Sequence, residues 1–151
     1  MKRLGGCLCG EVRFETIGDP ARVAVCHCRY CQLRTGSGFG ITVVFPIKSV
    51  IIQSGSFDFY SYRTENNTNL EISRCKKCGT SLFWTLDADR FKGMIATAGG
   101  TYDPPTFWTD LDVELFTRSK APFCVIESKE SHASSPYYEP KIAEDSRLDG
   151  S

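Results

Sequence analysis

Hydrophobic and polar residues alternate in short runs along most of the chain. The clearest alternation covers residues 11–17, where Val12 and Phe14 fall on one face and charged residues on the other. A period of two is typical of a half-buried β-strand, because successive side chains on a strand point to opposite faces. Residues 39–45 form a different run, rich in β-branched residues, that stops at Pro46. Both patterns predict strands.

Further short runs follow, and turn residues such as Gly, Asn and Asp separate them. They are too short for stable helices. The predicted strands cover residues 11–17, 22–26, 39–45, 50–53, 57–62, 70–73, 81–86, 94–98, 113–117 and 123–126. Helix is predicted only as a turn or two at residues 28–33 and a short piece at residues 88–91. The sequence therefore predicts a mainly β protein.

A chain of 151 residues fits one domain. Its 41% hydrophobic content excludes the disordered class, and its longest uncharged stretch, residues 35–47, is too short and too glycine-rich to span a bilayer. We expect a domain over residues 1–127 and a polar tail over residues 128–151. The tail is expected to pack loosely, at least beyond Pro140, with Tyr137 and Tyr138 docking it back.

Charge excludes one class of partner. Lys plus Arg and Asp plus Glu number 18 each, so the formal net charge is zero and the chain lacks the basic excess of a nucleic-acid-binding protein. The positive excess lies in residues 1–80 and the negative excess in residues 81–151. We expect neither a nucleic acid nor a membrane as partner.

The eight cysteines point to metal chemistry. Residues 4–10 lack the apolar core of a secretory leader, so a cytoplasmic location is expected, where thiols stay reduced unless a metal binds them. Seven of the eight fall into three tight groups. These groups are Cys7 with Cys9, then Cys26, Cys28 and Cys31, and then Cys75 with Cys78.

Two of these groups are pairs from distant segments. Tetrahedral zinc, with Zn–S distances of about 2.3 Å, takes its ligands as pairs on turns, whereas a disulfide between such close neighbours is strained and closes a tiny loop. The two pairs therefore indicate one closed, structural zinc site, which we call the four-cysteine cluster: Cys7, Cys9, Cys75 and Cys78. Paired disulfides and a mere run of buried thiols are the alternatives.

The middle group, the three-cysteine cluster, consists of Cys26, Cys28 and Cys31. One short loop can wrap these thiols around a single ion, and the fourth coordination position then stays open for chemistry. We therefore expect a second, catalytic zinc here. The alternatives are a site closed by His27 or Cys124, a pair of free thiols, or iron in place of zinc.

Neighbouring residues add weaker signals. An arginine beside an open zinc site would bind a substrate carboxylate or orient a thiol. The alternative is that these residues are simply part of a solvated loop. His27 lies between two ligands, so its side chain is expected to point away from the metal, and Cys124 is expected to be a small core residue. The polar residues that flank the three-cysteine cluster are Arg29, Tyr30, Gln32 and Arg34.

Three segments together resemble a known signature. They are Gly-Cys-Leu-Cys-Gly-Glu-Val-Arg-Phe at residues 6–14, Cys-His-Cys-Arg-Tyr-Cys at 26–31 and Arg-Cys-Lys-Lys-Cys-Gly at 74–79. These segments, in this order, resemble the sequence signature of the glutathione-dependent formaldehyde-activating enzyme family, whose domain is shared with centromere protein V. The resemblance covers about residues 3–127. One departure is Glu114-Leu115, at a place where the family often has a His-Ile pair.

The resemblance implies a zinc-stapled β-tent (Mss-four-like) of small antiparallel sheets, with two zinc ions per chain. It assigns the four-cysteine cluster to the structural zinc and the three-cysteine cluster to the catalytic zinc. The family's founding activity joins formaldehyde to glutathione and is classed as a carbon-sulfur lyase. The expected function is thus a zinc-dependent lyase that acts on an adduct of an aldehyde and a small thiol such as glutathione. A zinc-stapled binding module without catalysis and a metal or redox sensor are the alternatives.

Overall fold

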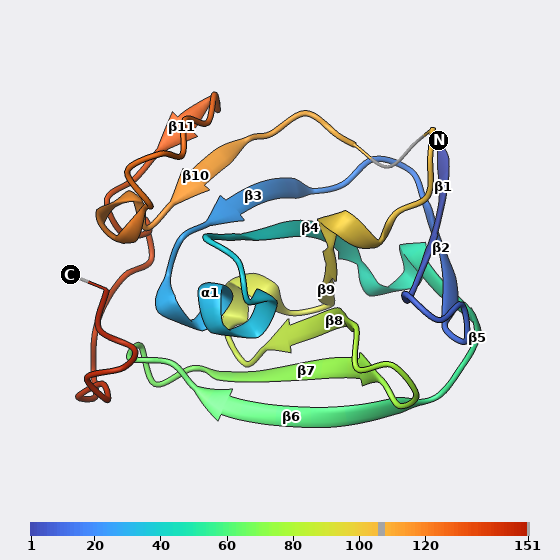
Figure 1. Ribbon diagram of the computed structural model, residues 1–151, viewed down its shortest axis with the longest axis horizontal. Helices are drawn as coiled ribbons and strands as arrows, with labels where there is room; N and C mark the ends of the chain where they lie inside the picture. Colours follow the sequence, from blue (N-terminus) through green and yellow to red (C-terminus); the bar gives the residue numbers. More distant parts are fainter. Residues whose placement is uncertain (106–107, 151) are drawn as a thin grey trace.

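The computed structural model describes residues 1–105 and 108–150, and two β-sheets form its framework (Figure 1). The smaller sheet has the strand order β1-β2-β5 and is antiparallel throughout. Its strands are β1 (Lys2–Gly6), β2 (Arg13–Ile17) and β5 (Val50–Ser54).

The larger sheet has eight strands within the described residues, in the order β11-β10-β3-β4-β9-β8-β7-β6. Neighbours from β3 to β6 pair antiparallel, whereas β10 pairs parallel with both β3 and β11. The strands are β3 (Arg22–Cys26), β4 (Gly40–Pro46), β6 (Phe57–Arg63), β7 (Asn69–Cys75), β8 (Ser81–Leu86), β9 (Met94–Ala98), β10 (Val113–Leu115) and β11 (Glu130–Ser131).

Helical structure is short. Helix α1 (Arg29–Thr35) begins after Cys28, which caps it, and ends at Gly36, whose φ of 64° favours glycine. The ring of Tyr30 stacks on Tyr62 in β6, so α1 is anchored to the far half of the larger sheet (Figure 1). The 3₁₀ turns are η1 (Ile47–Ser49), η2 (Asp89–Phe91), η3 (Gly99–Thr101) and η4 (Thr117–Ser119).

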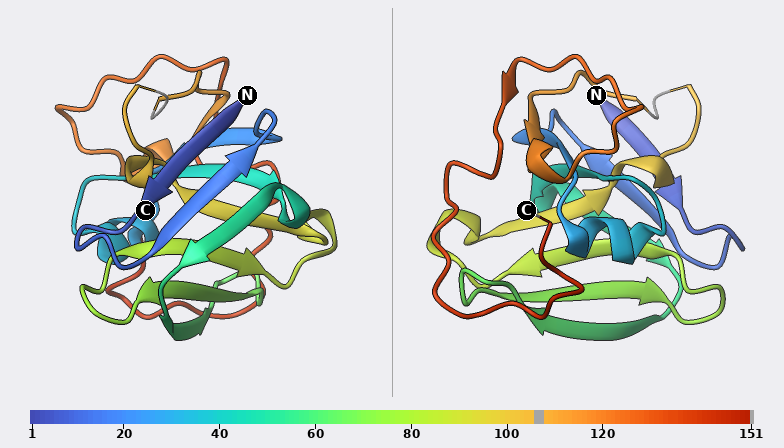
Figure 2. Two further views of the ribbon diagram at one scale, coloured as in Figure 1. Left: turned by 90° about the vertical axis from the view of Figure 1, so that its right-hand side faces the viewer. Right: turned by 60° about the vertical axis from the view of Figure 1, so that its left-hand side comes forward.

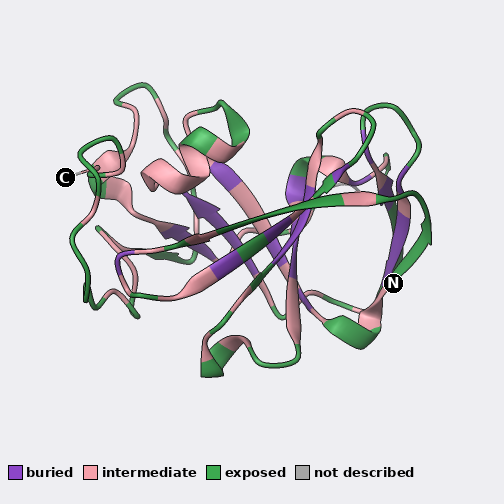
Figure 3. Cartoon of the chain, turned by 90° about the horizontal axis from the view of Figure 1, so that it is seen from below, coloured by how far each residue is buried: buried purple, intermediate pink, exposed green. Residues whose placement is uncertain are grey.

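The main core lies between the two sheets. Phe14 in β2 is fully buried and meets Phe83 of β8 edge to face, with ring centroids 5.0 Å apart. Tyr102 packs on the ring of Phe14, with centroids 5.3 Å apart, and the Tyr102 hydroxyl forms a hydrogen bond with Thr97 in β9 at 2.7 Å. Figure 3 shows that buried residues concentrate on the strands, which carry the core.

The prediction of a mainly β, single-domain fold is confirmed. Predicted and observed strands agree within two residues at each end for nine of the ten predicted strands, and α1 and η2 lie where helical turns were predicted. Strand β1 was not predicted, because its sequence offers two glycines and little alternation. Gly5 is there for packing: a Cβ on it would lie 2.5 Å from the ring of Phe14.

The predicted strand at residues 123–126 is wrong. This segment is a loop in which Phe123 and Val125 are 84% and 90% exposed. Strand β10 pairs with β3 on one side and with β11 on the other, so β10 leaves no edge for another strand. The prediction that Cys124 is a core residue is also wrong. Cys124 lies in this loop, and its thiol is only half-buried.

Beyond Pro140 most of the described residues are exposed, but hydrogen bonds fix the backbone of this segment near both of its ends. The backbone N–H groups of Lys141 and Ile142 donate to the carbonyl of Glu65, at 2.7 and 3.1 Å. The Ser119 hydroxyl donates to the carbonyl of Gly150 at 2.5 Å. Figure 2 shows the tail running down one side of the molecule. Within the described residues, no helix has the length and apolar character needed to cross a membrane.

Candidate metal centres and the adjoining cavity

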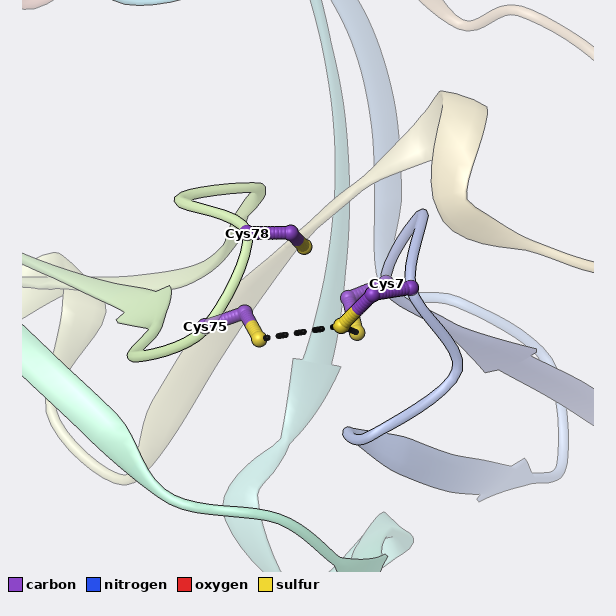
Figure 4. A group of neighbouring side chains, drawn as sticks. Cys7, Cys75 and Cys78 are labelled. Atoms are coloured by element: carbon purple, nitrogen blue, oxygen red, sulfur yellow. Dashed lines mark hydrogen bonds between the residues drawn. The ribbon is translucent and has the colours of Figure 1, made fainter.

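The four-cysteine cluster joins the two sheets. Cys7 and Cys9 lie on the turn between β1 and β2, Cys75 ends β7, and Cys78 lies on the turn between β7 and β8. Figure 4 shows Cys7 facing Cys75 and Cys78. All four sulfurs lie within 4.8 Å of one another. The Cys7–Cys9 and Cys9–Cys75 sulfur pairs are 3.5 and 3.8 Å apart, far beyond the roughly 2.05 Å of a disulfide bond. The thiols are free, and their arrangement could hold a metal ion.

Donors from both turns stabilise negative charge on these sulfurs. The N–H of Val12 donates to Cys7 Sγ at 3.2 Å, and the Thr80 hydroxyl lies 3.2 Å from Cys78 Sγ. The hydrogen bond from Thr80 lowers the pKa of the Cys78 thiol to about 5. Thr80 also accepts from the N–H of Leu8 at 3.2 Å, which ties the two turns together. Such donors favour the thiolate form that binds metals.

The three-cysteine cluster lies where β3 runs into α1. Cys26 ends the strand, Cys28 caps the helix and Cys31 lies in its first turn. The three sulfurs lie within 4.8 Å of one another, so they too could hold a metal ion. The neighbouring strand contributes Gly40, where a Cβ would lie 2.9 Å from the guanidinium of Arg34. The absence of a side chain there lets α1 pack close to the sheet.

Arg34 connects the three-cysteine cluster to the sheet. Its Nη2 lies 3.6 Å from Cys31 Sγ, and its guanidinium stacks 3.7 Å above the ring of Trp84. Hydrogen bonds from Cys26 and Cys28, helped by the charge of Arg34, lower the pKa of Cys31 well below its ordinary value. The shared hydrogen bond with Cys28 raises the pKa of Cys26. One thiolate is therefore favoured even before a metal binds.

His27 points away from the three sulfurs, as predicted. Its side chain is fully buried, and its Nε2 lies 2.9 Å from Oε1 of Glu114. The Nζ of Lys120 donates to the same oxygen at 2.8 Å. Burial raises the pKa of Glu114, but these two hydrogen bonds outweigh it, and the net shift is downward. Within the described residues, neither His27 nor Cys124 joins the group of donor atoms formed by the three thiols.

The role of Glu114 was not predicted from the sequence, in which this residue is only a departure from the family pattern. In the structure, Glu114 is 3% exposed and lies between Val113 and Leu115 on β10. A carboxylate flanked by apolar residues in a buried strand requires a partner, because an unpaired buried charge is strongly unfavourable. That signal was present in the sequence, but it did not identify His27 as the partner.

A cavity of about 370 Å³ opens beside the three-cysteine cluster, and Cys26, Cys28 and Cys31 line one part of it. Its apolar wall comes from strands β6 to β9 and η2, and its polar wall from α1, the β6–β7 loop and η4. The tail closes a third side. The lining includes Tyr62, Leu70, Trp84, Leu86, Phe91 and Met94 on the apolar wall, Arg29, Tyr30, Glu65 and Arg118 on the polar wall, and Tyr137, Tyr138, Glu144 and Leu148 from the tail.

One carboxyl group in this cavity has a pKa close to neutral pH. Glu65 is 7% exposed, and burial, together with a hydrogen bond with Glu144, raises the pKa of Glu65 to about 7. The guanidinium of Arg118 lies 3.9 Å from Glu65 and partly opposes that rise. This pair could not be predicted, because Glu65 and Glu144 are far apart in the chain and meet only when the tail docks.

The sequence matches a known protein family, and the fold resembles that of a solved structure. The sequence model of the family described as glutathione-dependent formaldehyde-activating enzyme (GFA) matches residues 2–119. A crystal structure of a Rhodobacter sphaeroides protein has a similar fold, with a TM-score of 0.51 at 18% sequence identity. That match covers 69% of this chain and 89% of the other. At this identity it supports the fold alone.

Proposed function

Because this chain belongs to the glutathione-dependent formaldehyde-activating enzyme family, we propose that it is a zinc-dependent carbon-sulfur lyase. The reaction would form or cleave the bond between the sulfur of a small thiol, such as glutathione, and the carbon of an aldehyde. The observation that carries the proposal is the position of the three-cysteine cluster, whose thiols line a cavity large enough for an organic ligand.

The donor sets fit zinc. Each consists of soft thiols grouped within 4.8 Å, and zinc binds such sulfurs tetrahedrally. We propose that Cys7, Cys9, Cys75 and Cys78 hold a structural zinc, and that Cys26, Cys28 and Cys31 hold a catalytic one. A zinc bound by three thiolates supplies a position for a fourth sulfur and stabilises it as a thiolate.

The chain's own residues would position the reactants. Arg34 fixes Cys31 and adds positive charge at that end of the cavity. Arg118, on the polar wall, offers a guanidinium to a carboxylate of the thiol substrate. In the forward direction the sulfur–carbon bond forms, the carbonyl π bond breaks, and the thiol proton ends on the new hydroxyl oxygen. Glu65, with a pKa of about 7, can hold or release a proton within this cavity.

Free thiols at both clusters require a reducing environment, and we propose the cytoplasm as the site of action. The partner would be a small-molecule thiol rather than a nucleic acid or a membrane. A neutral net charge agrees with this choice, since phosphate backbones and anionic lipids select basic surfaces.

The test is to mix zinc-loaded protein with glutathione and formaldehyde and follow the loss of free thiol. We expect adduct formation faster than in buffer, with Cys28→Ser losing the acceleration. The matched control is Cys124→Ser, which removes a thiol outside both clusters and should keep the activity. If the wild-type protein gives no acceleration with any thiol and aldehyde pair, the proposed function is wrong.

A further inference from the structure

The cavity beside the three-cysteine cluster offers far more room than formaldehyde needs. Its volume of about 370 Å³ lies within the range of roughly 300–1,000 Å³ found for organic ligands. A one-carbon aldehyde has no side chain to fill the space on the carbonyl side of the new bond. The lining of that space therefore indicates which group the aldehyde carries.

One part of the cavity lining, the aromatic wall, connects to the three-cysteine cluster. Trp84 is linked to Cys31 through Arg34, whose guanidinium lies 3.7 Å from the Trp84 ring and 3.6 Å from the Cys31 sulfur. Tyr62 stacks on Tyr30, the residue next to Cys31, with ring centroids 5.1 Å apart. Phe91 and Met94 also line the cavity and belong to this wall.

Other residues of the lining carry charge. Within the described residues, five arginines line the cavity, against the two carboxyl groups of Glu65 and Glu144. Arg118 lies at ion-pair distance from Glu65, and Arg22 from Glu130. This surplus of guanidinium groups suits a thiol that bears carboxylates, as glutathione does. With the polar wall assigned to the thiol, the aromatic wall remains for the substituent on the carbonyl carbon.

The tail completes the enclosure, and it lies beyond residue 119, where the family match ends. The ring of Tyr138 packs edge to face on Phe116, with centroids 5.8 Å apart, and its hydroxyl accepts from Arg118. Asn66 binds the tail at two points: its side-chain amide donates to the carbonyl of Tyr137 at 2.7 Å and accepts from the N–H of Glu139 at 2.9 Å. An apolar substituent is thereby shielded from water on the outer side.

We propose that the carbonyl substrate is an aldehyde with an aromatic or extended apolar side chain, held between the aromatic wall and the docked tail while its carbon bonds to the thiol sulfur. This inference rests on the proposed function and narrows its substrate class. The reaction is the addition already described, so it needs no oxidant or reductant. The thiol proton is transferred to the carbonyl oxygen as the sulfur–carbon bond forms.

A binding experiment separates this inference from the proposed function. Calorimetry on the zinc-loaded protein would compare S-methylglutathione with S-benzylglutathione, which differ in the group attached to sulfur. Burial of the ring is expected to make the benzyl compound bind about tenfold more tightly or better. Equal affinities would overturn the inference and leave the proposed function intact. Binding of neither compound, together with a lack of lyase activity, would overturn both.

Single substitutions then test which side chains contact the benzyl group. Phe91→Ala and Tyr138→Ala each remove a ring from the cavity lining and should lower the benzyl-to-methyl affinity ratio by about threefold or more. The matched control is Phe59→Ala, since Phe59 is 61% exposed on β6 and does not line the cavity. A ratio that falls equally in the control would contradict the assignment.

A kinetic comparison identifies which reactant carries the apolar group. The acceleration over the uncatalysed rate should be larger for glutathione with phenylacetaldehyde than for glutathione with formaldehyde. Phenylmethanethiol with formaldehyde should gain least, because it leaves the arginines without a carboxylate. If the aromatic thiol with formaldehyde gains most, the aromatic wall binds the thiol partner and the proposal is wrong.

Discussion

Cys28 combines two structural tasks that can be separated by substitution. Its sulfur belongs to the three-cysteine cluster, and the same sulfur accepts from the N–H of Cys31 at 3.5 Å as the cap of α1. Serine is among the best helix-capping residues, so Cys28→Ser removes the metal ligand and keeps the cap. The local fold should therefore survive a change that abolishes metal binding at this cluster.

For Cys28→Ser we expect bound zinc to fall from two ions per chain to one, with an unchanged circular dichroism spectrum. Elemental analysis gives the metal content, and Cys124→Ser, as the control, should retain both ions. A variant that loses both ions, or that unfolds, would show that the three-cysteine cluster also stabilises the fold.

Glu65 predicts a pH dependence of stability. Its pKa is about 7 in the folded protein, above its usual value of 4.5, because burial and Glu144 disfavour its charged form. Between these two values the folded state binds more protons than the unfolded state. The contribution of Glu65 to the free energy of unfolding is therefore fully present below about pH 4.5 and is lost as the pH rises through about 7.

Glu65→Gln should flatten this decline between pH 5 and 8 and should leave the variant at least as stable as the wild type at pH 8. Urea unfolding at several pH values measures the effect. The exposed Glu71→Gln on β7 should keep the wild-type slope. An unchanged slope in Glu65→Gln would show that Glu65 is not the group responsible.

Among the elements, the tail depends on a few polar contacts. Asn66 makes two hydrogen bonds to it, and a typical hydrogen bond contributes about 0.5–1.5 kcal/mol to stability. Asn66→Ala should therefore lower the free energy of unfolding by about 1–3 kcal/mol and raise the protease sensitivity of residues 135–150. Asn66→Asp keeps the acceptor for Glu139 and should give a smaller effect. Equal proteolysis of all three proteins would contradict this role of Asn66.

Local elements were predictable because local patterns determine them. Alternation and β-branched runs identified β2 to β10, and the cysteine spacing identified both clusters before their sulfurs were seen together. Pairing between distant segments was not predictable. The parallel pairing of β10 with β3 joins Val113 to Ala24, and the short strand β11 next to β10 removed the edge that residues 123–126 would have needed.

At the scale of the whole molecule, the cavity could not be predicted from the sequence either. Its walls come from strands, helix α1 and the tail, and they meet only after the larger sheet has formed and the tail has docked. Residues such as Trp84 and Tyr62 have the pattern of ordinary strand residues in the sequence. In the structure, their contacts with Arg34 and Tyr30 connect them to the three-cysteine cluster.

The four-cysteine cluster also acts at the scale of the whole molecule, because it holds the two sheets together. Cys7 and Cys9 belong to the smaller sheet's hairpin, Cys75 and Cys78 belong to the larger sheet, and Cys7 and Cys75 are buried in the core that contains Phe14 and Phe83. Without a bound metal, the four thiols would lose their shared partner, and the two turns would be joined by packing and by hydrogen bonds such as that from the N–H of Leu8 to Thr80. Structural zinc contributes directly to folding stability in such sites.

Titration with a chelator should therefore release the two ions in separate steps. The ion at the three-cysteine cluster, which faces the cavity, should leave first, without a change in circular dichroism. The ion at the four-cysteine cluster should leave only together with cooperative unfolding, and Cys75→Ser should fold poorly even with excess zinc. A metal-sensitive dye recorded alongside circular dichroism follows both steps. Simultaneous release of both ions, or complete release from a protein that stays folded, would contradict the division of the seven thiols into a structural and a catalytic site.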